Sequence, residues 1–111
     1  MTQLMKESKS DLERNVDHII ETIESGYYET EDENGPNGLD YLTDALDFNY
    51  IVHNDKTYKG ARILVAFGGP NIWIDTLQKQ VEGYWWGKEI IKSYSQDNLD
   101  LDETCEELFN C

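Results

Sequence analysis

Four carboxylates in the first amphipathic segment are the residues whose type and spacing could form a binding site. They are separated by four, four and three positions, and the set is Glu13, Asp17, Glu21 and Glu24, called the acidic stripe below. At 100° per residue they fall on one side of an α-helix, beside its apolar face. Like charges at such spacing repel by roughly 0.2–0.5 kcal/mol per pair, and Arg14 is the one base close to them in the sequence. The acidic stripe therefore predicts a surface that binds cationic groups.

Acidic residues are concentrated at the two ends of the chain. Residues 1–48 hold 13 acids and 3 bases, residues 49–94 hold 4 acids and 6 bases, and residues 95–111 hold 6 acids and no base, within a net charge of −14. Beyond the stripe, the acids expected to contact a partner are Glu31, Asp32, Glu33, Asp102, Glu103 and Glu106. This balance disfavours direct binding to nucleic acid or to an anionic membrane. It favours a basic protein as the partner.

Other reactive side chains lack the spacing of a catalytic or metal site. His18 and His53 have no cysteine or histidine at metal-ligand spacing. Asp75 and Glu82 lie on the two arms of a predicted hairpin, but no lysine stands beside the second carboxylate as a metal-dependent nuclease would need. The run Gly68-Gly69-Pro70-Asn71 lacks the Gly-Lys-Ser/Thr ending of a phosphate-binding loop and precedes a strand. We therefore expect no enzymatic activity, no metal and no cofactor.

Tryptophans form a second candidate contact, because tryptophan is enriched at the energetic centres of protein interfaces. The three are Trp73, Trp85 and Trp86. In a strand, Trp85 points to the opposite face from Tyr84 and Trp86. One face is expected to pack under the helices, and the other to contact a partner or a second copy in a homodimer. The alternative is that each of them packs in the core. The net charge counts against a stacking platform for single-stranded nucleic acid.

Helical periodicity is clear near the beginning of the chain. Ser10 and Glu13 form a capping box, and Gly26 is expected to end the helix that follows. Between them, apolar residues recur at helical spacing at Leu12, Val16, Ile19, Ile20 and Ile23. After the polar loop 29–38, a short second helix is predicted over residues 39–47.

The middle of the chain is rich in β-branched and aromatic residues, which predict strands. The predicted strands cover residues 50–53, 61–67, 72–76 and 81–86. Residues 88–94 fit either an edge strand or a helical turn. Asp100 and Glu103 repeat the capping pattern and predict a C-terminal helix. The fold class is therefore α+β, an antiparallel sheet of about four strands with two N-terminal helices and one C-terminal helix.

The length of 111 residues predicts a single domain that covers residues 1–111. No apolar stretch approaches the roughly 20 residues that span a bilayer, and the first residues lack the apolar core of a signal peptide. A cytoplasmic location is therefore expected. Cys105 and Cys111 are six positions apart, on different helix faces, so we expect both to be reduced thiols.

In size, acidity and separation of charge, the chain resembles the small inhibitors that phages and mobile elements carry against restriction or CRISPR nucleases. The resemblance covers the overall character of the whole chain and rests on no family motif, so no site residue carries over. Members of that class commonly occupy the nucleic-acid or PAM-reading groove of a nuclease, which is rich in Arg and Lys, or lock its domains.

The expected function is therefore that of an acidic, protein-binding inhibitor of anti-CRISPR or anti-restriction type. As a DNA mimic it would occupy a basic nucleic-acid-binding surface of its target, a CRISPR or restriction nuclease. Two alternatives stand beside it. One is an accessory domain whose charge only keeps it soluble, and the other, ranked lower, is a small enzyme or ligand-binding protein.

Overall fold

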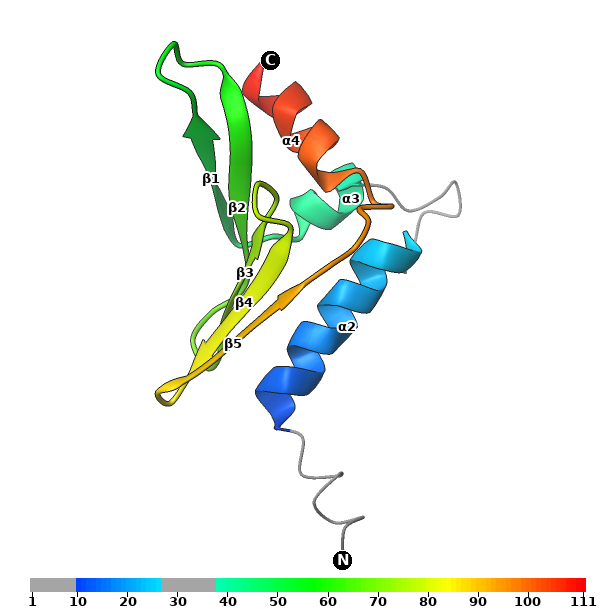
Figure 1. Ribbon diagram of the computed structural model, residues 1–111, viewed down its shortest axis with the longest axis vertical. Coiled ribbons are helices and arrows are strands. Elements are labelled where there is room, and N and C mark those ends of the chain that lie inside the picture. Colours follow the sequence, from blue (N-terminus) through cyan, green and yellow to red (C-terminus); the bar gives the residue numbers. More distant parts are fainter. Residues whose placement is uncertain (1–9, 27–37) are drawn as a thin grey trace, which may run out of the picture.

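The computed structural model describes residues 10–26 and 38–111. In chain order its elements are α2 (Asp11–Ser25), α3 (Gly38–Thr43), β1 (Asp47–Val52), β2 (Tyr58–Ala66), β3 (Asn71–Asp75), β4 (Gln80–Trp85), β5 (Lys88–Ser93) and α4 (Leu101–Phe109). The strands form one antiparallel sheet in the order β1-β2-β3-β4-β5. The described helices lie on one side of this sheet, with α2 against β4 and β5, α4 against β2, and α3 against α4 (Figure 1). The predicted α+β class is confirmed, with five strands where about four were expected.

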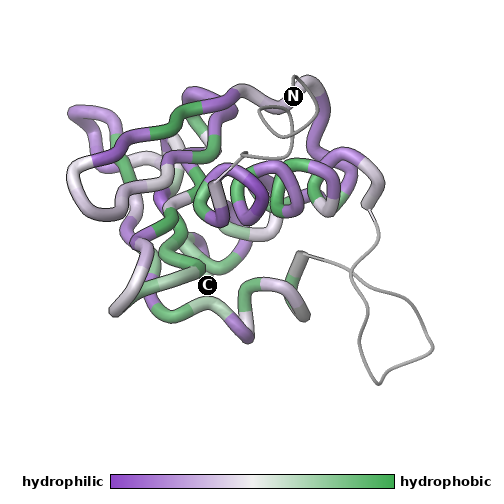
Figure 2. The backbone as a smooth tube through the Cα atoms, turned by 90° about the horizontal axis from the view of Figure 1, so that it is seen from below, coloured by the Kyte–Doolittle hydropathy of each residue, from purple (hydrophilic) through white to green (hydrophobic). Residues whose placement is uncertain are grey.

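The helix α2 forms where the caps and the apolar spacing predicted it. The Ser10 hydroxyl accepts a hydrogen bond from the Glu13 backbone N–H at 3.1 Å. Gly26 has a left-handed backbone, with φ of 75°, and its N–H donates to the Thr22 carbonyl. The turns between these caps alternate hydrophobic and hydrophilic segments (Figure 2). This is the pattern of a helix with one buried face.

A glycine on β4 sets how closely α2 approaches the sheet. A Cβ at Gly83 would lie 2.9 Å from both Leu12 Cδ1 and Val16 Cγ2 of α2. Leu12 and Val16 are fully buried, and they join a core that includes Ile72 and Val81 of the sheet. The absence of a side chain at Gly83 therefore lets the apolar face of α2 rest directly on the central strands.

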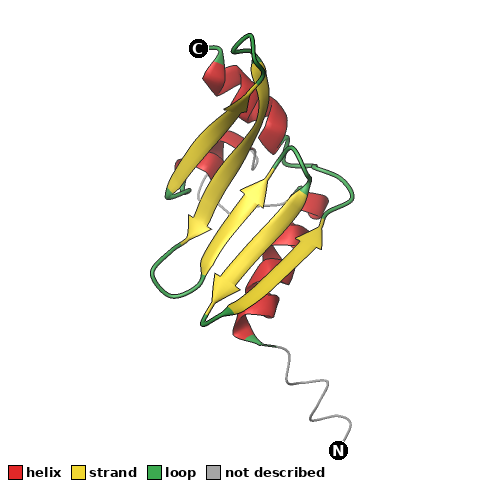
Figure 3. Ribbon diagram, turned by 60° about the vertical axis from the view of Figure 1, so that its left-hand side comes forward, coloured by secondary structure: helices red, strands yellow, loops and turns green. Residues whose placement is uncertain are grey.

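Two β-bulges twist the sheet on its β2 side. Lys59 is skipped in the β1–β2 register and Val65 in the β2–β3 register. Bulges increase the local right-handed twist of a strand. In Figure 3 the β1–β2 pair is accordingly turned relative to the other three strands.

The second helix is shorter than its sequence pattern predicted. The prediction of residues 39–47 is wrong at its C-terminal end, because α3 ends at Thr43 and β1 already begins at Asp47. The Leu46 N–H donates to the Leu64 carbonyl at 2.9 Å, which pulls this residue into the sheet. Leu39 and Leu46 are exposed, and only Leu42 of the predicted apolar side is buried.

The segment left open between a strand and a helical turn is the edge strand β5. It follows β4 through a two-residue turn in which Trp86 and Gly87 both have positive φ, 52° and 77°. Positive φ at both central positions is the geometry of a type I′ hairpin turn, which matches the twist of the flanking strands. None of the helices in the described part of the chain is long and apolar enough to cross a membrane.

Candidate functional site

The acidic stripe on α2 lies against β5, where a lysine neutralises two of its members. The Lys92 ammonium donates to Glu13 Oε2 and to Asp17 Oδ1, each at 2.8 Å. These hydrogen bonds, that to Asp17 above all, raise the pKa of Lys92. The sequence placed only Arg14 near the stripe, and that expectation is wrong, because the pairing of β5 with β4 brings Lys92 under α2. Glu13 and Asp17 therefore hold the helix to the sheet.

Glu24, the last member of the stripe, also contacts its own domain. Its Oε2 accepts hydrogen bonds from the backbone N–H of Ser95 at 2.7 Å and from the Ser95 hydroxyl at 3.0 Å. Glu21 is the member that stays exposed. The loop acids Glu31, Asp32 and Glu33 lie outside the described residues. On α2 the predicted partner surface is thus reduced to Glu21.

The N-terminus of α4 uses its acids for capping, but not with the predicted residue. Asp100 has a left-handed backbone and no side-chain capping bond. Asp97 caps instead, because its two carboxylate oxygens accept from the N–H groups of Leu101 and Asp102, both at 3.1 Å. Asp102, predicted to contact a partner, accepts a hydrogen bond from the Tyr58 hydroxyl at 2.8 Å and ties α4 to β2.

The remaining acids of α4 form an exposed group, Glu103, Glu106 and Glu107, called the α4 acidic surface below. Their positions span about 100° of the helix, opposite the buried Leu101 and Cys105. No salt bridge joins any of the three to a base within residues 10–26 and 38–111. Two of them stand in the last turn, which carries no base, although the helix dipole favours cations there.

The open face of the sheet carries a hydrogen-bonded group around Glu82, which is 6% exposed. Arg62 donates to its Oε1 at 2.7 Å, and Tyr84 and Gln80 also donate to the carboxylate. Burial alone would raise the pKa of Glu82, but the hydrogen bonds from Tyr84 and Gln80 and the Arg62 charge together lower it. Burial and the nearby Glu82 raise the pKa of Tyr84 to about 12. The three donors therefore keep Glu82 ionised, and its carboxylate links side chains of β2 and β4.

The three tryptophans occupy three different environments. Trp73 lies on the open face with the Arg62 guanidinium 4.6 Å from its ring centroid, a cation–π contact. Trp85 packs against the hydrophobic core on the helix side. Trp86 is in the β4–β5 turn and is 88% exposed. The expectation that Trp85 and Trp86 point to opposite faces of a strand fails because the strand ends between them.

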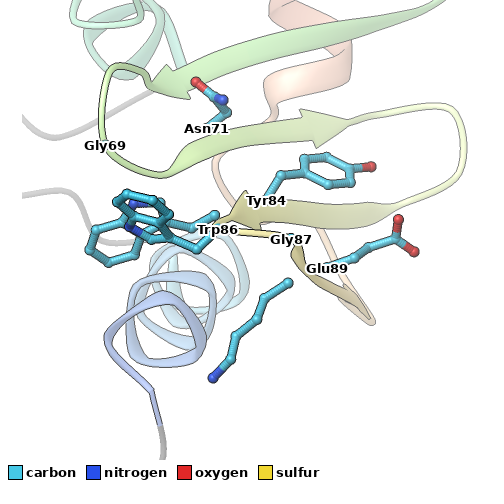
Figure 4. Close-up of a pocket in the computed structure, with 8 residues that line it drawn as sticks. Gly69, Asn71, Tyr84, Trp86, Gly87 and Glu89 are labelled. Atoms are coloured by element: carbon cyan, nitrogen blue, oxygen red, sulfur yellow. The ribbon is translucent and has the colours of Figure 1, made fainter.

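A hollow of about 300 Å³ lies between the β2–β3 loop and the β4–β5 turn. Gly69, Tyr84, Trp86 and Glu89 are among the residues that line it (Figure 4). In that view the indole rings lie to the left of the β4–β5 turn, and the Tyr84 and Glu89 side chains lie to its right. The hollow combines aromatic surface with open glycine backbone, since a Cβ at Gly69 would have no atom within 4 Å.

The histidines and cysteines of the described residues lie in separate environments. His18 and His53 are both exposed and on separate elements. Cys105 is buried, and this burial raises the pKa of its thiol to about 12. In the part of the chain that the structure describes, no three metal-ligating side chains converge. Both cysteines are free thiols, as expected from their spacing.

Comparison of the chain with protein families, with curated proteins and with solved structures finds no match. A functional proposal therefore depends on the surfaces described above.

Proposed function

We propose that this chain is an acidic protein-binding inhibitor that occupies the basic nucleic-acid-binding surface of a nucleic-acid-processing enzyme, of the anti-CRISPR or anti-restriction type. The observation that carries the proposal is the α4 acidic surface, whose three carboxylates meet no base in the described part of the chain. The acids of α2 do not support it in the same way, because Glu13, Asp17 and Glu24 contact Lys92 and Ser95.

The placement of these acids is unfavourable for the isolated domain. Glu103 repels Glu106 and Glu107 at helical spacings of three and four, by roughly 0.2–0.5 kcal/mol per pair. Glu106 and Glu107 also face the negative end of the helix dipole, which disfavours carboxylates by roughly 0.3–1 kcal/mol each. A cationic partner would remove both effects. The fold itself gains nothing from carboxylates at these positions.

The spacing of the α4 acidic surface suits a partner that normally binds nucleic acid. Three carboxylates from Glu103 to Glu107 occupy about 6 Å of helix axis at about 1.5 Å per residue. Their mean axial spacing is therefore about 3 Å, which gives a little over half the charge density of a duplex, about one charge per 1.7 Å. Grooves that hold nucleic acid are lined with Arg and Lys. Association with such a groove would be fast and sensitive to salt.

The test compares two charge-reversed variants that change the net charge equally. Glu106→Lys/Glu107→Lys alters the α4 acidic surface, and Asp11→Lys/Glu89→Lys, the control variant, alters exposed acids on α2 and β5. Each is added to restriction and CRISPR nucleases cleaving DNA, at two salt concentrations. We expect the unaltered chain to inhibit a nuclease of the panel, less strongly at high salt. The α4 variant should lose at least tenfold in inhibition, and the control variant should retain it.

Stability measurements separate lost binding from lost folding. Because Glu106→Lys/Glu107→Lys removes repulsion and places cations at the C-terminal end of α4, its free energy of unfolding should equal or exceed that of the unaltered chain. Equal loss of inhibition in both variants would mean that only net charge matters. Absence of inhibition across the panel would favour an acidic domain whose charge only keeps it soluble.

A further inference from the structure

The three most exposed large hydrophobic side chains of the described residues stand at one end of the sheet. They are Leu46, 58% exposed, Phe67, 73% exposed, and Trp86, 88% exposed, and are called the apolar end below. Leu46 precedes β1, Phe67 follows β2, and Trp86 follows β4. In an antiparallel sheet with this strand order, the start of β1 and the ends of β2 and β4 lie at the same end of the sheet.

The order of the strands places these residues in a row. Figure 3 shows the start of β1, the β2–β3 loop and the β4–β5 turn following one another along this end of the sheet. Neighbouring strands are about 4.8 Å apart, so β1 and β4 are separated by roughly 14 Å. The hollow of about 300 Å³ opens between the β2–β3 loop and the β4–β5 turn, beside Trp86. The apolar end thus joins projecting side chains to a concave surface.

Trp86 is an unfavourable residue for the backbone conformation that its turn requires. Its φ is 52°, at the first central position of a type I′ turn, where asparagine, aspartate and glycine are preferred. A bulky residue in the left-handed region is strained. In addition its indole is almost entirely exposed, so packing within the domain does not offset this strain. Strain of this kind, held at an exposed aromatic, is typical of a binding residue.

The charges beside the apolar end indicate the chemistry of its partner. Asp47 adjoins Leu46, and Glu89 lies on β5 just after the Trp86 turn. Both are exposed, and neither forms a salt bridge with a described residue. Lys88 is the one base beside the turn in this stretch of sequence. A second copy of a chain with net charge −14 would bring like charges together here.

We propose that the apolar end binds a cationic amphipathic helix of a partner protein. Phe67 and Trp86 pack against its apolar stripe, and Asp47 and Glu89 face its lysines or arginines. A row of about 14 Å matches the apolar stripe of a helix, in which side chains of one face recur about every 5.4 Å. This inference stands on a different surface from the α4 acidic surface and does not depend on inhibition of a nuclease.

The test uses two designed 18-residue peptides and the full chain labelled with ¹⁵N. One peptide carries leucines on one helical face and lysines on the other, and the control has the same lysines with glutamine in place of each leucine. We expect the leucine–lysine peptide to shift the Trp86 indole N–H signal and the Phe67 amide signal. The control peptide should shift them at least tenfold less at equal concentration. Unchanged signals at the apolar end, or shifts confined to α4, would overturn the inference.

A variant whose new residue suits the β4–β5 turn keeps the test independent of folding. Trp86→Asn supplies the residue that a type I′ turn prefers and should leave the rest of the spectrum unchanged. We expect it to weaken binding of the leucine–lysine peptide at least tenfold, whereas Leu39→Ala, at an exposed leucine on α3, should not. Trp86 signals that shift with protein concentration alone would identify a second copy as the occupant. Larger shifts with single-stranded oligothymidine than with the peptide would identify a nucleic-acid platform, and either result overturns the proposal.

Discussion

The ammonium group of Lys92 on β5 lies 2.8 Å from the Asp17 carboxylate on α2, although 75 positions separate them in the chain. The same ammonium also reaches Glu13 one turn earlier on α2. Two members of the acidic stripe are therefore used within the fold. Carboxylates that look like a binding surface in the sequence form the polar margin of the contact between α2 and the sheet.

Replacing Lys92 should therefore lower stability by a small amount. The lysine side chain is 35% exposed and its two partners are similarly exposed, so solvent screens the pairs and we expect Lys92→Ala to cost about 0.5–1 kcal/mol. Urea unfolding at low salt measures the free energy, and the cost should shrink as salt is added. In an Asp17→Asn/Glu13→Gln background the cost should fall further. An equal cost in both backgrounds would show that only packing of the lysine stem is lost.

The raised pKa of Lys92 fixes the pH range in which this contribution disappears. Because its folded pKa lies above its ordinary value of 10.5, the pairing contributes in full below that value and is lost as the pH rises through the folded pKa. The cost of Lys92→Ala should thus be constant from pH 7 to pH 9. Lys88→Ala, at an exposed position on the same strand, should have little effect throughout this range.

Replacing Gly83 with a residue that has a side chain should destabilise the contact between α2 and the sheet. A Cβ there would lie 2.9 Å from side-chain atoms of both Leu12 and Val16, and such overpacking costs about 1–3 kcal/mol. Urea unfolding of Gly83→Ala should show this loss. Gly69→Ala is the matched control, because a Cβ there meets no atom within 4 Å, and it should change stability by less than about 0.5 kcal/mol. Similar values for both variants would contradict the close approach of α2.

Local signals were sufficient to predict α2 and insufficient for the ends of the other helices. Ser10 and Gly26 cap α2 as expected, since a cap depends on residues within one turn. At α4 the same rule selected Asp100, but its left-handed backbone turns the side chain away from capping and Asp97 caps instead. The predicted second helix was cut short because Leu46 bonds to Leu64, a contact that depends on sheet register.

The candidate sites show the same division between local and long-range information. The exposed position of Glu106 follows from helical periodicity alone. The Lys92 contacts follow from β5 pairing with β4, and residues 88–94 did not reveal in sequence whether they form a strand. Trp85 and Trp86 differ in burial because β4 ends between them. The predicted strand was one residue longer and included Trp86, so it assigned the Trp86 side chain to a face of the sheet.

The two thiols should differ sharply in reactivity. Cys105 is buried, with a pKa raised to about 12 by burial and by the nearby Asp102 and Asp97, whereas Cys111 is exposed. Since the thiolate is the reactive form, Ellman's reagent at pH 8 should modify one thiol per folded chain quickly. The second should react only after unfolding in urea. Cys111→Ser should abolish the fast reaction, and two fast thiols in the unaltered chain would contradict the packing of α4.

Glu82 is expected to contribute more to stability than any exposed acid of the sheet. It accepts hydrogen bonds from Arg62, Gln80 and Tyr84 while almost fully buried. Glu82→Gln keeps the shape but removes the charge that pairs with Arg62, so unfolding at pH 7 should require about 1.5–3 kcal/mol less free energy. Glu89→Gln on the adjacent strand, at an exposed position, should cost less than about 0.5 kcal/mol.

The pH dependence of the Glu82→Gln effect tests its cause. The folded pKa of Glu82 lies below the ordinary value of 4.5, so the carboxylate contributes stability above that value. The contribution is lost as the pH falls through the folded pKa, because the unfolded chain then binds the proton more readily than the folded chain. The difference between the unaltered chain and Glu82→Gln should consequently be constant from pH 7 to pH 6 and diminish below pH 4.5. A difference that persists unchanged at pH 3 would mean that amide packing, rather than the charge facing Arg62, accounts for the loss.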